Sequence, residues 1–153
     1  MKKEISIKKI REDAEASFRK GDFYCSEAIL HSINENFELN MSDETLAMAS
    51  GFPVGIGKSK CVCGAVTGGI LSLGFFFGRS KGGDDKVQNT LVLANELQQS
   101  FRDKYGCLCC SVQTKGMDMA SGEHKAQCIR FTGEIAEKTA EIITRELNIT
   151  IMD

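Results

Sequence analysis

The sequence lacks tryptophan altogether and contains one proline and two histidines among 153 residues, yet it holds seven cysteines. It also lacks the apolar N-terminal segment of a signal peptide, because Met1-Lys2-Lys3-Glu4-Ile5 leads directly into charged amphipathic sequence. We therefore expect a cytoplasmic protein in a reducing compartment. In that setting clustered cysteines more often bind a metal or perform thiol redox chemistry than form structural disulfides.

An excess of basic residues is also missing, since 19 Lys and Arg stand against 21 Asp and Glu, for a net charge of -2. This balance argues against nucleic acid as a partner. The uncharged run at residues 61–78 has the minimum length of a membrane span, but it is glycine-rich, flanked by basic residues at both ends and without a second candidate. We interpret it as a buried core helix, and expect no membrane partner.

The remaining pattern predicts an all-α single domain over residues 1–153, a bundle of about five or six helices. Apolar residues recur at helical spacing, and Gly21, Gly51 and Gly106 mark helix ends. The only short β-like run is residues 149–151. The expected helices cover residues 7–20, 22–37, 42–51, 61–78, 84–105 and 123–147.

The helix at 61–78 is predicted to lie buried at the centre of the bundle because it contains Gly64, Gly68, Gly69 and Gly74. Each glycine costs about 1 kcal/mol relative to alanine inside a helix, so close packing of a neighbour must compensate. That neighbour can be another helix of the chain. The alternative is a second copy, which would make the glycine strip a homodimer interface in a non-enzymatic interaction module.

Four cysteines are predicted to point inward or to lie at helix ends: Cys25, Cys63, Cys110 and Cys128. Cys61 and Cys63 fall at the start of the central helix, where free N–H groups and the helix dipole favour a thiolate. We therefore expect Cys63 to be the most reactive thiol. Cys107 and Cys110 have the C-x-x-C spacing of a disulfide pair or of two ligands to one metal.

Other cofactor chemistry finds less support in the sequence. His124 precedes Cys128 by four residues and could be a further metal ligand, although an exposed, uninvolved histidine is the preferred interpretation. Ser111 follows Cys110, so the C-x-x-C-H attachment site of covalent c-type haem is absent. No grouping of serine, histidine and acid indicates a hydrolase.

These residues together resemble a known family. Cys63-Gly64-Ala65-Val66-Thr67-Gly68, with Cys25 before it and Cys110 and Cys128 after it, is similar to the redox-active proteins named for a C, GCAxxG, C, C pattern. The resemblance spans about residues 20 to 145 and implies a small helical protein, distantly similar to the helical part of split-Soret cytochromes. It implies roles for Cys25, Cys63, Cys110 and Cys128 only, so Cys61, Cys107 and Cys109 are additions.

Three functional hypotheses follow. In the first, Cys25, Cys63, Cys110 and Cys128, with Cys61 as a further metal ligand, hold a metal or an iron–sulfur centre or cycle between dithiol and disulfide, with an electron-transfer protein as partner. In the second, the protein is a thiol oxidoreductase whose catalytic thiols are Cys107 and Cys110, or Cys63. The third is the non-enzymatic oligomeric module.

Overall fold

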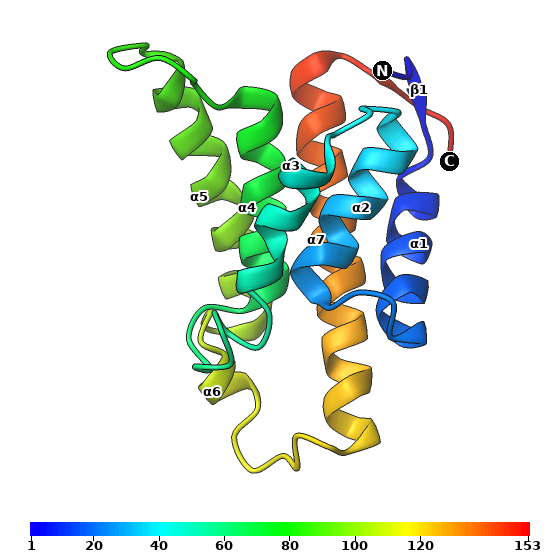
Figure 1. Cartoon of the computed structure of the whole chain (residues 1–153), viewed down its shortest axis with the longest axis vertical. Coiled ribbons are helices and arrows are strands. Elements are labelled where there is room, and N and C mark those ends of the chain that lie inside the picture. Colours follow the sequence, from blue (N-terminus) through cyan, green and yellow to red (C-terminus); the bar gives the residue numbers. More distant parts are fainter.

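A computed structural model describes residues 1–153, and it shows a single bundle of helices (Figure 1). The all-α prediction is confirmed, with seven α-helices and one 3-10 turn. The elements are β1 (Glu4–Ile5), α1 (Ile7–Lys20), α2 (Cys25–Phe37), α3 (Asp43–Ala47), η1 (Met48–Gly51), α4 (Gly64–Phe77), α5 (Lys86–Tyr105), α6 (Cys110–Gln113), α7 (Gly122–Leu147) and β2 (Thr150–Ile151).

Helix α4 lies at the centre, packed against α2, α5 and α7, while α1 packs against α2 and α7 on the other side. One core of 21 buried residues runs through all of these helices. The buried, glycine-rich central helix is therefore confirmed, but it begins at Gly64, whereas the prediction placed its start at Cys61. Residues 61–63 instead form an extended entry to the helix.

The glycines of α4 face different neighbours. A Cβ on Gly68 would lie 2.6 Å from the Ser26 Cα of α2, and one on Gly69 would lie 2.6 Å from Leu97 of α5. Gly68 and Gly69 are thus covered by helices of the same chain and do not face a second copy, while the homodimer itself stays a prediction. Gly74 is the exception, because a Cβ there would meet no atom within 4 Å.

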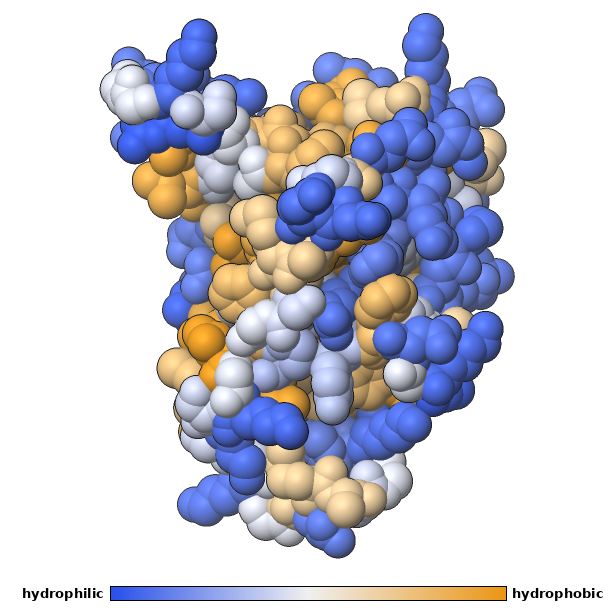
Figure 2. Space-filling model, in the orientation of Figure 1, coloured by the Kyte–Doolittle hydropathy of each residue, from blue (hydrophilic) through white to orange (hydrophobic).

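Gly74 lies in an apolar groove of about 540 Å³ together with Leu71 and Phe75, whose side chain is 46% exposed. Apolar surface is visible over the side of the molecule formed by α3, α4 and α5, whereas the α1 side is mainly hydrophilic (Figure 2). No helix of the structure combines the length and the apolar character that crossing a membrane requires.

The chain termini meet in a two-stranded parallel pair, in which Glu4 is opposite Thr150 and Ile5 opposite Ile151. The sequence suggested a strand only at residues 149–151, and its partner at Glu4–Ile5 was missed. Two residues are too few for a periodic pattern, and their pairing depends on α1 and α7 lying side by side. The short helix α6 was not predicted either, because its four residues are also too few for a periodic pattern.

The loop before α4 has an unusual backbone. Val54, Ile56, Lys58 and Lys60 all have positive φ, between 55° and 67°, as do the glycines between them. Positive φ is a true outlier for the β-branched Val54 and Ile56. Residues 54–60 therefore form a left-handed turn, interrupted only at Ser59 and held by backbone bonds such as Cys61 N–H to Gly55 O at 2.8 Å.

Candidate functional site

Four cysteines and one histidine line a small cavity of about 80 Å³ at the lower end of the bundle as drawn in Figure 1. These residues are Cys25, Cys63, Cys110, His124 and Cys128. The rest of the wall is largely apolar and includes Phe18, Val54 and Phe131. The four cysteines that the family resemblance selects are therefore brought to one place by the fold.

Each cysteine is held by a different element. Cys25 is the first residue of α2, Cys63 is the N-cap residue of α4, Cys110 is the first residue of α6, and Cys128 lies in the second turn of α7. Cys25, Cys63 and Cys110 lie at the N-terminal end of a helix, where free backbone N–H groups favour negative charge, whereas Cys128 lies beyond the first turn.

A short antiparallel contact brings Cys63 and Cys110 together across 47 residues of sequence. Val62 and Cys109 form a β-bridge, Cys63 N–H donates to Leu108 O at 2.8 Å, and Cys110 N–H donates to Cys61 O at 2.6 Å. This contact fixes the position of α6 beside the start of α4.

Gly64 leaves room for the sulfur of Cys25. A Cβ on Gly64 would lie 2.5 Å from Cys25 Sγ and 3.1 Å from the carbonyl oxygen of Phe52. Alanine at this position would therefore displace the thiol from the cavity or push α4 away from the 52–53 backbone. The glycine that follows Cys63 in the motif has this steric function.

Burial raises the pKa of all four cavity thiols, and at Cys25, Cys63 and Cys128 the proximity of other cavity thiols adds to the effect. Burial is the largest cause at Cys25, followed by the charges of Cys63 and Cys128. It also raises the pKa of Cys63 and Cys110, and raises that of Cys128 to about 12. In the metal-free protein these thiols are consequently protonated near neutral pH.

Backbone N–H groups partly oppose this effect at two of the sulfurs. Their hydrogen bonds lower the pKa of Cys25 and of Cys63, but burial outweighs them at both. This direction runs against the expectation that Cys63 is the best thiolate, because the cost of desolvation at its sulfur exceeds the stabilisation by the start of α4. The donors are Ser26 and Val54 at Cys25, and Ala65 and Val66 at Cys63.

The other three cysteines are not part of the cavity wall. Cys61 is exposed, so the structure does not bring this predicted metal ligand to the other four. Cys107 lies next to Gln113, whose amide nitrogen is 3.7 Å from its sulfur, and its C-x-x-C partner Cys110 faces the cavity instead. All seven cysteines are free thiols.

His124 belongs to the site, contrary to the preferred interpretation of the sequence. Helix α7 begins at Gly122, early enough to place His124 on the same face as Cys128, with Nε2 3.4 Å from the Cys128 sulfur. The spacing of four residues was the available signal. This spacing places His124 beside Cys128 only if the helix begins before His124, and the sequence did not determine the first residue of the helix.

We expect Cys109 to be the thiol most rapidly alkylated in metal-free, reduced protein at neutral pH. The Ser111 hydroxyl, 3.0 Å from its sulfur, lowers the pKa of Cys109, so more of it is thiolate than of the buried thiols. Peptide-resolved mass spectrometry after timed alkylation measures the rates. Cys25 and Cys128 should react slowest, and faster reaction at Cys63 than at Cys109 would contradict the order given by burial.

Fold and site together define a small helical protein with a half-buried four-cysteine cavity. The chain matches the family described as "Putative redox-active protein (C_GCAxxG_C_C)" over residues 23–142. That match covers most of the chain, and the protein belongs to this redox-active family.

A relative from Archaeoglobus fulgidus, which carries the name "Uncharacterized protein", is 25% identical over 122 residues. The similarity covers 75% of this chain and 81% of the relative. No solved structure matches the chain.

Proposed function

We propose that Cys25, Cys63, Cys110 and Cys128 bind an iron–sulfur centre, or another metal centre with thiolate ligands, and that the protein transfers electrons through it. The observation that carries this proposal is the convergence of the four cysteines on one largely apolar cavity. Four cysteine thiolates are the usual ligand set of iron–sulfur clusters, and soft sulfur donors favour iron–sulfur, zinc or copper(I).

The geometry bears on how a centre would be held. No group of three or more His, Cys, Asp or Glu side chains is placed to hold a single metal ion. The cavity, at about 80 Å³, has room for several water-sized groups. The support for a bound centre is therefore the shared cavity, and not a preformed arrangement of ligands.

The surrounding residues suit such a centre. When bound, the centre would supply one-electron transfer. The backbone N–H groups near Cys25 and Cys63 would stabilise negative charge on the sulfurs, and hydrogen bonds of this kind tune the potential of clusters. Phe18 and Phe131 limit the access of water, while His124 offers one further nitrogen.

Dithiol and disulfide cycling at the same four cysteines is less well supported. The thiolate is the reactive form in thiol exchange, and the pKa of each cavity thiol is raised. A positively charged metal centre reverses this disadvantage, because it stabilises the thiolates that burial and mutual repulsion disfavour.

Anaerobic purification followed by iron, acid-labile sulfide and visible absorption measurements tests the proposal. We expect iron and sulfide in stoichiometric amounts, and their loss in Cys63→Ser and Cys128→Ser. Cys61→Ser and Cys107→Ser are matched controls, since both thiols lie outside the cavity wall, and should retain the centre. A wild-type protein that contains no metal after reconstitution, or equal loss in all four variants, would refute the proposal.

A further inference from the structure

Two segments that lie next to each other at the cavity end contain lysines and no acidic residue. Residues 52–63 include Lys58 and Lys60, and residues 106–117 include Lys115. The segments are joined by the Val62–Cys109 bridge and by the bond from Ser111 N–H to Lys60 O at 2.9 Å. We call the exposed surface of residues 56–61 and 111–115 the lysine face.

The positive charges of this face are free. None of its three lysines forms a salt bridge, which is also true of Lys81 and Lys86 but not of Lys104 and Lys138. The acids next to the second segment, Asp103 and Asp118, keep their negative charge while accepting hydrogen bonds from Gln99 and from Ala120 N–H, and neither pairs with a lysine of the face. With a net charge of -2 for the whole chain and +3 on this face, the charges of the remaining residues sum to -5.

The lysine face is also the outer side of the backbone that carries two cavity cysteines. Cys110 N–H donates to Cys61 O, and Cys63 follows Cys61 by two residues. Cys110 itself is half-buried, and the charge of Lys60 acts on its sulfur. A protein bound here would contact the same two backbone segments that position Cys63 and Cys110.

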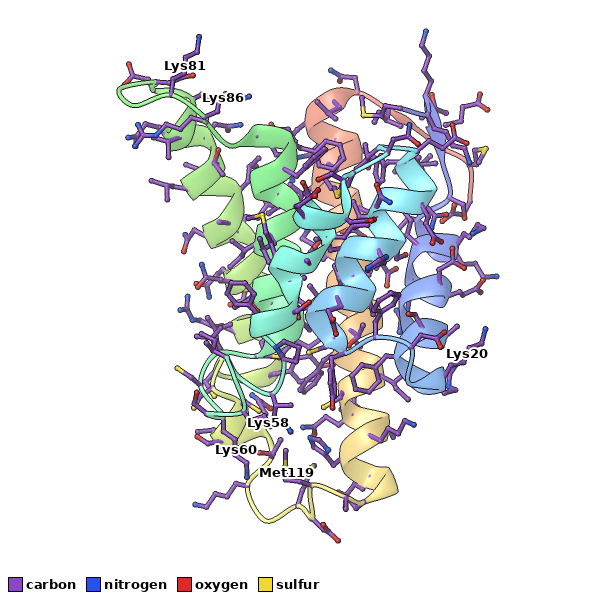
Figure 3. All side chains as sticks on the ribbon, in the orientation of Figure 1. Lys20, Lys58, Lys60, Lys81, Lys86 and Met119 are labelled. Atoms are coloured by element: carbon purple, nitrogen blue, oxygen red, sulfur yellow. The ribbon has the colours of Figure 1, made fainter.

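The left-handed turn holds two of the lysines in place. Lys58 and Lys60 have φ of 64° and 55°, and the Lys60 carbonyl group accepts the bond from Ser111 N–H. Both side chains are exposed at the cavity end of the bundle (Figure 3). The backbone positions of the two lysines are therefore fixed, while each exposed side chain keeps its rotamer freedom.

We propose that the lysine face docks a small acidic electron-transfer protein, which exchanges electrons with the centre held by the four cysteines. This inference rests on the proposed function, and adds the surface and the charge of the partner. Complementary charge steers such partners into contact and sets their orientation. Three lysines on a chain of net negative charge are too few for stable binding to nucleic acid, which favours a protein partner.

Binding to two acidic probes, a plant-type ferredoxin and a flavodoxin, tests the proposal by isothermal titration calorimetry at low salt. We expect at least one to bind, with an affinity that falls as the ionic strength rises from about 0.05 M to about 0.3 M. Lys58→Glu/Lys60→Glu should weaken binding by at least about tenfold, since each like-charge contact repels the partner.

Lys81→Glu/Lys86→Glu is the matched control. Figure 3 shows these lysines at the opposite end of the bundle, and they too are exposed and without salt bridges. This double variant has the same net charge as the first and should bind within about twofold of the wild type. Equal losses in both variants, or binding that salt does not weaken, would overturn the assignment of the face.

Three further results would also overturn it. One is the absence of binding to both probes. The second is binding to phosphatidylserine-containing vesicles, and the third is binding to duplex DNA. Either would count if it depends on Lys58 and Lys60 and neither acidic protein binds. Calorimetry is carried out on loaded and on metal-free protein, and metal content is measured separately. A failure of docking is thereby distinguished from a failure to hold a centre.

Discussion

Gly68→Leu should lower the free energy of unfolding by about 3 kcal/mol or more, at the upper end of the usual cost of overpacking. A Cβ at this position would lie 2.6 Å from Ser26 Cα and 2.9 Å from Ser26 O, which are backbone atoms of α2. A side chain could move away from the new leucine by changing its rotamer, but these backbone atoms cannot. Helices α2 and α4 would therefore have to separate, and the core between them would loosen.

Gly74→Leu is the matched control, with the same substitution on the same helix. A Cβ there would meet nothing within 4 Å, and leucine has a much higher helix propensity than glycine. We expect unchanged stability or a gain of up to about 1 kcal/mol. Chemical denaturation with circular dichroism measures both variants, and a similar loss in the two would show that Gly68 is not the closer contact.

Metal-free, reduced protein should lose stability as the pH rises above about 9, and Cys128→Ala should remove part of that loss. The pKa of Cys128 is raised from its ordinary value of 9.0 to about 12 in the folded state. Below pH 9 the thiol is protonated in both states. Above it the unfolded chain releases the proton while the folded protein keeps it, so unfolding becomes easier up to about pH 12.

For this thiol the free energy of unfolding should fall by about 1.4 kcal/mol per pH unit, or by about 2 kcal/mol in all at a pH near 10.5. Urea denaturation of wild type and Cys128→Ala at pH values of about 8 and about 10.5 measures the difference. Cys61→Ala, which removes an exposed thiol outside the cavity, should retain the wild-type pH dependence. Identical pH dependence in wild type and Cys128→Ala would contradict the raised pKa.

The helices could be predicted from the sequence because their signals are local. Ile7, Ile10 and Ala14 have helical spacing, and all three are buried on α1. Gly21 has positive φ at the end of that helix, as its position after Arg19 and Lys20 indicated. The signals failed where an element is short or depends on a distant partner, as for β1 and α6.

The candidate site was predictable as a set of residues but not as a chemical environment. The order and spacing of the cysteines selected Cys25, Cys63, Cys110 and Cys128, which the cavity brings together. Whether Cys63 is a thiolate depends on the balance between the helix N-terminus and desolvation. Desolvation is set by every atom that packs around the sulfur, and those atoms come from distant parts of the chain.

The sequence by itself determined the helical class, the position of the glycine-rich helix and the four cysteines of its family pattern. Only the tertiary structure decided that Gly64 makes room for Cys25, that His124 faces Cys128, and that Cys61 remains outside. It also joined residues 61–63 to 108–110. Periodicity describes which face of one helix is apolar, whereas these contacts depend on how separate helices and loops meet.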